Sequence, residues 1–241
     1  MRILITNDDS VSASQLLPLI RWCRKLGEVT TVVPKFEQSA KSHGIEIHKP
    51  FAFEKTALAP DVTVYAVDST PADCVRFAVL GLHQQFDLVI SGINRGFNIG
   101  TDVMYSGTVA AVIEASVLGL NAIALSTCPE YYDQAVQHLD RIFDFIRNNR
   151  LLEQHSIYNI NIPPQPKSIR FTHQGGIFYS DDFSLSDDGI CRPIGKCVHV
   201  PSDDLTLDTN AVMNGYISIM PLTTNMTDMA MYQKLTELNE E

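Results

Sequence analysis

The chain opens with a short apolar segment, Arg2 to Thr6, that runs directly into the acidic sequence Asn7-Asp8-Asp9. Such a segment is typical of a strand buried on both faces of a parallel sheet. Ligands of these sheets bind just beyond the carboxyl ends of the strands. Two adjacent carboxylates repel each other there unless a hard divalent cation lies between them. The feature therefore predicts an α/β fold with a cation site at the first strand end, and the alternative is a solvated turn that caps a helix.

Strand-like and helix-like segments alternate as far as residue 164. We predict further strands at 29–33, 45–53, 62–67, 87–90, 122–126 and 157–162. We predict helices at 16–26, 70–82, 107–118 and 132–148. This alternation predicts a mostly parallel sheet flanked by helices.

The alternation stops after residue 164. Residues 165–212 are polar and read as irregular, 215–220 as a late strand, and 225–240 as a terminal helix. We therefore divide the chain into an α/β catalytic core, residues 1–164, and an extension of the same domain, residues 165–241. The extension lacks the apolar periodicity of an independent core, so we expect it to serve oligomerisation.

Charge and hydropathy exclude several partners. The formal net charge is −10, and the longest basic run is the pair Arg24-Lys25. A nucleic-acid polymer and an anionic membrane surface are therefore poor partners. No apolar run approaches the roughly 18 residues that span a bilayer. Because no basic and apolar leader precedes the first strand, we expect a cytoplasmic protein.

The five cysteines form no C-x-x-C pair. We expect reduced thiols, as in a cytosolic protein. The alternative is that Cys191 and Cys197 form a disulfide or bind a metal ion.

Three polar clusters follow three of the predicted strands. They are residues 7–9, the sequence Glu-Gln-Ser at 37–39, and Ser91 to Asn94. Their donors are carboxylate, hydroxyl and amide oxygens, and none requires Cys or His. This donor set favours Mg²⁺, Mn²⁺ or Ca²⁺ over Zn²⁺.

The sequence Tyr-Ser-Gly-Thr at 105–108 opens a predicted helix. Free backbone N–H groups in a first helical turn bind phosphate well. The alternative for Ser106 is an ordinary helix N-cap. For Asn94 and Asn98, the alternative is a turn residue with a left-handed backbone.

These features belong to a set of motifs in a definite order along the chain. The set comprises Asn7-Asp8-Asp9, Ser39, Thr70 to Val75, Ser91 to Gly96, Asp102-Val103, Tyr105 to Val109, Asn159 to Pro163 and Gly215 to Ile219. It resembles the SurE family, the stationary-phase survival proteins, whose members are metal-dependent 5′/3′-nucleotidases. The resemblance covers nearly the whole chain.

The resemblance also implies roles for single residues. One divalent ion per subunit, Mg²⁺ or Mn²⁺, would be held by Asp8, Asp9, Ser39 and Asn94. The two aspartates would be the catalytic residues. The substrate phosphate would be bound by Asn98, Ser106, Gly107 and Thr108. The family further implies a Rossmann-like core, an exchanged carboxy-terminal element, and a homodimer or homotetramer.

Two positions depart from the family pattern. The family has Gly where this chain has Ser10 and Ser69. If either backbone requires a positive φ, serine costs about 1 kcal/mol. The departures bear on the shape of the loops, since all of the implied ligands are present.

The function expected from these features is hydrolysis of nucleoside 5′- or 3′-monophosphates to nucleoside and phosphate. The cation would polarise the phosphoryl group and lower the pKa of a bound water. Ser106 and the helix terminus would stabilise the equatorial oxygens. Two questions stay open: whether Asp8 attacks or positions a water, and whether His43 is an acid or phosphate contact or a loop residue with a satisfied hydrogen bond.

Three other classes are weighed against this function. A non-catalytic nucleotide-binding regulator would retain the same fold. A receiver domain has paired acids after its first strand but is about half this length. A dinucleotide oxidoreductase needs G-x-G-x-x-G at the first helix, where this chain has no glycine from Asp9 to Ala13.

Overall fold

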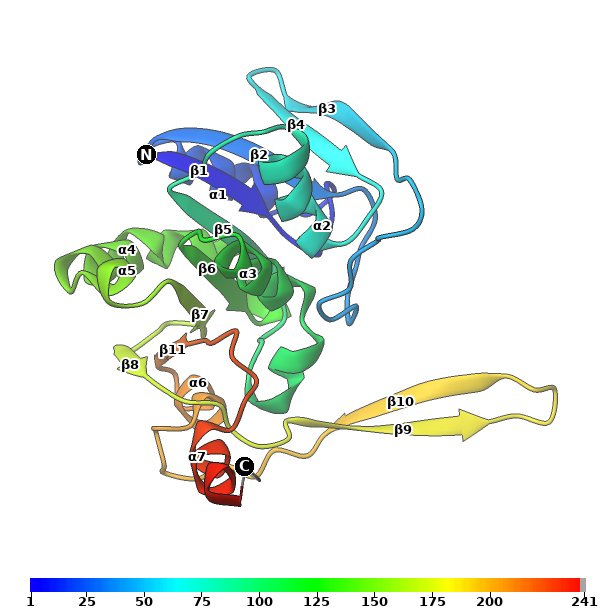
Figure 1. The fold of residues 1–241 in the computed structure, drawn as a ribbon, viewed down its shortest axis with the longest axis vertical. Coiled ribbons are helices and arrows are strands. Elements are labelled where there is room, and N and C mark those ends of the chain that lie inside the picture. Colours follow the sequence, from blue (N-terminus) through cyan, green and yellow to red (C-terminus); the bar gives the residue numbers. More distant parts are fainter. Residues whose placement is uncertain (239–241) are drawn as a thin grey trace.

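The central strands of the chain form the middle of a nine-stranded sheet in the computed structural model, which describes residues 1–238 (Figure 1). The spatial order is β3-β4-β2-β1-β5-β6-β7-β11-β8. The parallel middle consists of β4 (Val62–Val67), β2 (Glu28–Pro34), β1 (Arg2–Thr6), β5 (Leu88–Arg95), β6 (Ala122–Thr127) and β7 (Ile157–Ile162). The edges are β3 (Phe53–Ala59), antiparallel to β4, and β11 (Ile217–Pro221), antiparallel to β7 and parallel to β8 (Ile169–Phe171).

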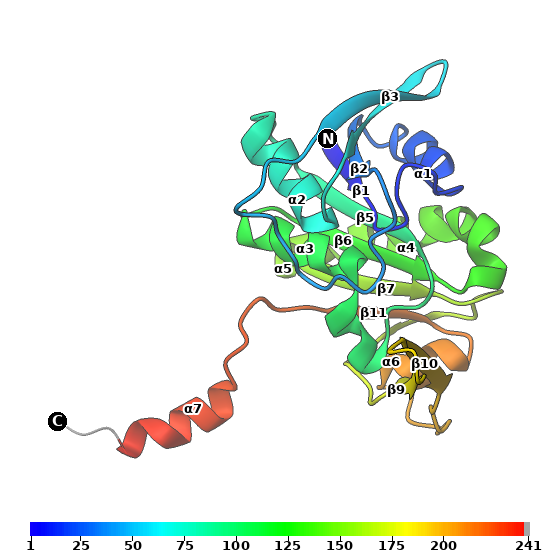
Figure 2. The same cartoon turned by 90° about the vertical axis from the view of Figure 1, so that its right-hand side faces the viewer.

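Alternate residues of β1 face opposite sides of the sheet and two separate cores. Ile3 and Ile5 belong to one buried cluster, and Leu4 belongs to the other. The first core is covered by α1 (Leu16–Cys23), a 3₁₀ segment (Pro129–His138), α4 (Leu139–Asn148) and α5 (Leu151–Gln154). The second is covered by α2 (Pro71–Arg76), a π-helical segment (Phe77–Gly81) and α3 (Gly107–Val117). Figure 2 shows helices on both faces, so the predicted α/β class is confirmed.

The strand order changes direction at β1. Successive strands lead away from β1 through β2 and β4 on one side and through β5, β6 and β7 on the other. In open α/β sheets, the crevice beyond the carboxyl ends of the strands at such a switch point binds the ligand. The ends of β1 and β5 therefore mark the first place to look for a site.

Three of the sequence predictions about secondary structure are wrong. The predicted helix 132–148 is α-helical only from Leu139, since residues 129–138 form a 3₁₀ segment. Residues 45–52 form a loop, because Thr70 Oγ1 donates to Gly44 O at 2.7 Å and the Glu46 N–H donates to Asp73 at 2.8 Å. The segment 165–212, expected to be irregular, contains β8, the hairpin of β9 (Tyr179–Leu185) and β10 (Cys191–Cys197), and α6 (Asp208–Met213). The hairpin has almost wholly exposed strands, so it lacks the one-sided apolar pattern that identifies a strand.

Two elements of the extension, the β9–β10 hairpin and the last helix, project from the body. The β9–β10 hairpin reaches away in Figure 1, and α7 (Met229–Leu235) stands off on a long connection in Figure 2. The predicted terminal helix begins at Met229 rather than 225, and its last predicted residues, 239 and 240, lie outside the described part of the chain. None of the helices within residues 1–238 combines the length and apolar character that crossing a membrane requires.

A buried carboxylate joins the loop after β5 to the loop after β8. Asp208 has no exposed surface and accepts hydrogen bonds from the N–H groups of Gly100 at 3.0 Å, Gly175 at 2.7 Å and Thr209 at 2.7 Å. Gly100 needs to be glycine, since its φ is +57° and an added Cβ would lie 2.2 Å from Gly176 O.

We expect Asp208→Asn to lower the free energy of unfolding by about 1–3 kcal/mol, because the amide can no longer accept all three bonds and leaves a buried N–H unpaired. Urea denaturation measures the change. Asp203→Asn, at an exposed neighbouring carboxylate, is the control and should leave the midpoint unchanged. Equal midpoints for the two variants would contradict the structural role of Asp208.

Candidate active site

Asp8 lies at the end of β1, against the first turn of α3. Its carboxylate accepts a hydrogen bond from Thr108 Oγ1 and another from the Thr108 N–H at 3.2 Å. Gly107 makes this approach possible, because an added Cβ would lie 3.0 Å from Asp8 Cβ. Burial raises the pKa of Asp8, and the two bonds from Thr108 partly oppose that rise. The positive end of α3 thus faces a buried acid.

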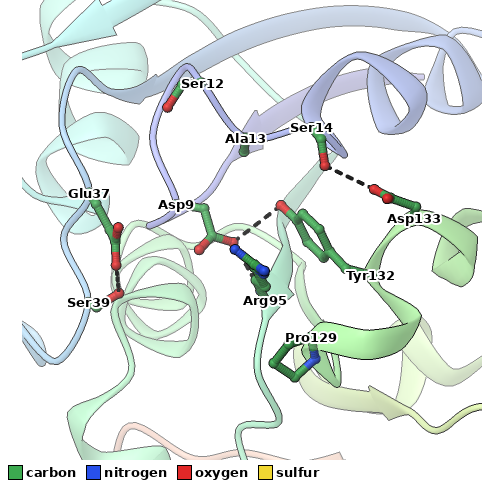
Figure 3. A pocket seen from close by; sticks show the side chains of 10 residues that line it. All are labelled: Asp9, Ser12, Ala13, Ser14, Glu37, Ser39, Arg95, Pro129, Tyr132 and Asp133. Carbon is green, nitrogen blue, oxygen red and sulfur yellow. Dashed lines mark hydrogen bonds between the residues drawn. The ribbon is translucent and has the colours of Figure 1, made fainter.

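Asp9 turns into an open cavity beside Asp8 (Figure 3). One of its oxygens, Oδ2, accepts from the Arg95 N–H at 3.0 Å and from the Tyr132 hydroxyl at 3.4 Å. Burial, and then the nearby charge of Asp8, raise the pKa of Asp9 to about 6. Burial, and then the same carboxylate, raise the pKa of Tyr132 above its usual range, which keeps the hydroxyl protonated. Asp9 is therefore held at one oxygen and open at the other.

The loop after β2 carries the second polar cluster, residues 37–39, to this cavity. The Gln38 N–H donates to Asp8 O at 2.8 Å, which ties the loop to the end of β1. Ser39 Oγ donates to Glu37 Oε1 at 2.7 Å, and both side chains line the cavity with Asp9. The predicted convergence of the first two clusters is therefore seen in the geometry.

Asn94 reaches the same edge from β5. The pairing of β5 with β6 shifts register between Ser91 and Asn94, a β-bulge that redirects the side chains at the strand end. Asn94 Nδ2 donates to Gly96 O at 2.8 Å, so its amide nitrogen points back to the loop. No hydrogen bond within residues 1–238 uses Asn94 Oδ1, which is left as an oxygen donor for a cation.

The cavity that Asp9, Glu37 and Ser39 line has a volume of about 720 Å³, and Asp8 and Asn94 lie beside it rather than in its lining. Its acidic side chains are Asp9, Glu37 and Asp133, and its basic side chain is Arg95. Within residues 1–238, no Lys, Arg or His side chain forms an ion pair with Asp8 or Asp9. Across the same residues, no cluster of three or more His, Cys, Asp or Glu side chains could hold a metal ion. A cation here would need the oxygens of Ser39 and Asn94 as well as the carboxylates.

The expected phosphate turn is largely occupied by internal contacts. Ser106 Oγ accepts from the Val109 N–H at 3.1 Å, which is the helix N-cap that was the alternative for this residue. The Thr108 N–H is bonded to Asp8. Among residues 1–238, the Gly107 N–H has no hydrogen-bond partner and the Ser106 hydroxyl accepts a bond but donates none, so these two groups of the turn can donate to a phosphate oxygen.

The structure gives Asn98 a contact other than the expected phosphate. Its Nδ2 donates to Ser126 Oγ at 2.8 Å, and its N–H donates to Asn161 Oδ1 at 2.9 Å. Its carbonyl accepts from Asn159 and Asn161. With its amide nitrogen used and the residue buried, Asn98 fastens the loop after β5 to β6 and β7.

His43 also has a settled partner. Its Nε2 lies 2.8 Å from Oε2 of the buried Glu114, and Arg76 bonds the other oxygen of that carboxylate at 3.0 Å. These two contacts, the first of them to His43, lower the pKa of Glu114. His43 is thus the loop residue with a satisfied hydrogen bond, and it anchors the loop that carries Ser39.

The two serines that depart from the family pattern behave differently. Ser10 has a φ of 77°, so the turn after the paired aspartates does require a left-handed backbone. Ser69 is not among the residues with positive φ, and its Oγ donates to Asp73 Oδ2 at 2.5 Å. Serine is therefore strained at position 10 and supplies a hydrogen bond at position 69.

Two residues of the site were not singled out by sequence reasoning. Arg95 was noted only as part of a motif, and Tyr132 only as the start of a predicted helix. Neither position has a local signal, because each reaches Asp9 through the arrangement of β5 and of the segment after β6.

Comparison with known proteins agrees with this architecture. The family model described as "Survival protein SurE" matches residues 3–181. The chain is 37% identical over 245 residues to the 5′-nucleotidase SurE of Thermoanaerobacter pseudethanolicus, covering 96% of this chain and 95% of that protein. It is 35% identical over 254 residues to the 5′-nucleotidase SurE of Thermosipho melanesiensis, covering 100% and 98%. The crystal structure of the SurE protein from Aquifex aeolicus matches it with a TM-score of 0.81 and 28% identity over the whole of both chains. With matches of this extent, the chain belongs to the SurE family.

Proposed function

We propose that this chain is a metal-dependent nucleotidase that hydrolyses nucleoside 5′- or 3′-monophosphates to nucleoside and phosphate. The observation that carries the proposal is the pair Asp8 and Asp9, two carboxylates with raised pKa values at the switch point of the sheet and without an ion-pair partner in residues 1–238. The names of the curated relatives, 5′-nucleotidase SurE, support the same reaction.

The donor set fits one hard divalent cation, Mg²⁺ or Mn²⁺, held by Asp8, Asp9, Ser39 and Asn94. The repulsion between the two carboxylates, to which Glu37 adds, is the observation that favours a cation. The free carboxylate oxygen of Asp9 is a charged donor, and the free amide oxygen of Asn94 is a neutral one. Both lie at the carboxyl-end edge of the sheet. When bound, the ion supplies positive charge to the phosphoryl group and Lewis acidity toward water.

The residues of the chain have separate tasks in this reaction. Thr108 orients Asp8, and the Arg95 N–H and Tyr132 orient Asp9. The Gly107 N–H, at the positive end of α3, is placed to bind a phosphate oxygen. The Ser106 hydroxyl accepts the cap bond and keeps its proton to donate to a phosphate oxygen. We assign Thr108 to shaping this turn, and Asn98 to fixing the loop beside it, because their donors are already hydrogen-bonded.

A cytoplasmic protein remains our proposal for location. All five cysteines are free, including the exposed Cys191 and Cys197, which lie opposite Leu185 and Tyr179 across the hairpin rather than opposite each other. Reduced thiols are usual for cytosolic proteins.

The competing function is a nucleotide-binding regulator without catalysis, and the strain at Ser10 is the observation that favours it.

Phosphate release from a nucleoside monophosphate separates the two functions. We expect release with added Mn²⁺ or Mg²⁺, none in excess EDTA, and poor recovery with Zn²⁺. Asp9→Asn should lower turnover more than tenfold, on the order of a lost metal ligand. Asp68→Asn, at an exposed carboxylate, is the control with full turnover. Undiminished hydrolysis in chelator would rule out the metal mechanism, and nucleotide binding without release would favour the regulator.

Asp9→Asn should also stabilise the metal-free protein. Near pH 4 and below, Asp9 is protonated in the folded chain, so the folded state pays no free-energy penalty for a buried charge there. As the pH rises through the folded pKa of about 6, that benefit is lost, because the folded state now holds a buried charge. Allowing for the partial exposure of Asp9, we expect the variant to be more stable by about 1–2 kcal/mol at pH 7.5, with the difference vanishing near pH 4. Urea unfolding in EDTA at both pH values measures this. A difference independent of pH would show that charge is not its cause.

We further propose that the extension, residues 165–241, joins copies of this chain into a homodimer or homotetramer. The hairpin exposes Phe183 (61%) and Leu185 (78%). All of α7 is exposed, including Tyr232 and Leu235. Projecting elements with this much apolar surface are typical of interfaces.

Light scattering at micromolar concentration should therefore give a mass at least twice the 26.8 kDa of one chain. The double variant Phe183→Glu with Leu235→Glu should lower that mass, because both substitutions place charge on the apolar surfaces. Lys234→Gln, on α7 beside Leu235, is the control and should keep it. A monomer of the unmodified chain would refute the assembly.

A further inference from the structure

A second cavity of about 700 Å³ adjoins the candidate active site. It lies beyond the carboxyl ends of β5, β6 and β7, the same edge of the sheet as Asp9. Arg95 and Pro129 line both cavities, and Figure 3 shows them on the opposite side of Asp9 from Ser12. A molecule anchored by its phosphate near Asp9 can therefore extend directly past Arg95 into the second cavity.

The walls of this second cavity differ in chemistry from the first. Phe97, Phe178, Tyr179 and Met213 supply aromatic and thioether surface, and its exposed lining is mostly apolar where that of the first cavity is mostly polar. Phe97 is partly buried and packs against the small apolar cluster of Ile99, Phe178 and Val212. Their arrangement offers a firm apolar surface to a flat ligand.

We propose that this second cavity binds the purine or pyrimidine base of the substrate, with Tyr179 and Met213 contacting it and Arg95 lying between base and phosphate. The assignment rests on the proposed function, since it takes the phosphate to bind near Asp9. A base has an apolar face that stacks on aromatic side chains whatever its identity. A phosphate, in contrast, gains nothing from such a surface. Residues of the extension thus take part in substrate recognition as well as in assembly.

The test compares two phosphate esters that differ by the base. Adenosine 5′-monophosphate carries one and ribose 5-phosphate does not. Tyr179→Ala and Met213→Ala truncate half-exposed lining side chains, so neither should unfold the chain. We expect each to lower kcat/KM for the nucleotide about tenfold, mainly through KM, and to leave ribose 5-phosphate unchanged. Val200→Ala, at a residue 82% exposed and outside the cavity lining, is the matched control with wild-type kinetics on both.

Adenosine binding to the metal-free chain is the second readout. Saturation-transfer NMR should detect the nucleoside with the unmodified chain and with Val200→Ala, and the signal should weaken with Tyr179→Ala and Met213→Ala. Equal losses on both esters, or unchanged nucleotide kinetics and adenosine binding in the two variants, overturn the base site. Absence of hydrolysis of either ester by the unmodified chain would refute the nucleotidase instead, and adenosine binding would then still decide the base site.

Discussion

The contact between Asp8 and the first turn of α3 is the constraint on which the rest of the site depends. Asp8 and Thr108 are 100 residues apart, and their two hydrogen bonds join the central strand to the helix that covers it. The bonds form only because Gly107 leaves room for the carboxylate. The helix terminus partly offsets the cost of burying an acid. Both donors of Thr108 are thereby committed to Asp8, and the Gly107 N–H remains for a phosphate.

The same contact places a buried charge next to two others. Asp9 adjoins Asp8, and Glu37 adds its repulsion to both. In a chain without a cation this arrangement lowers stability, and the left-handed backbone of Ser10 adds to the loss. Sites that bind ions or substrates often hold such strain, since the ligand relieves it. The polar cluster is therefore better explained by what it binds than by how it folds.

The sequence predicts the parts of this structure that rest on interactions between near neighbours in the chain. It does not predict the parts that rest on contacts between distant residues. The strand before Asp8 and the start of the helix at Gly107 are local signals, and both are found where predicted. Ser39 reaches the site because parallel strands end at one edge, which strand order alone suggests. The contacts of Asn98 were not predicted because its partners lie on β6 and β7, some 28 to 63 residues away. The β9–β10 hairpin was missed because neither of its faces is buried within one chain.

The extension is built into the fold rather than appended to it. β11 pairs with β7 and so continues the central sheet, while Asp208 fastens α6 to the loop after β5. That loop carries Phe97, and the first residue of β9 is Tyr179, so the cavity proposed for the base has one wall from each part of the chain. An interface formed by the projecting hairpin would therefore involve β9, the strand that carries Tyr179. The proposed assembly and the proposed base site would be linked in this way, because a shift of β9 would move Tyr179 relative to Phe97 in the core.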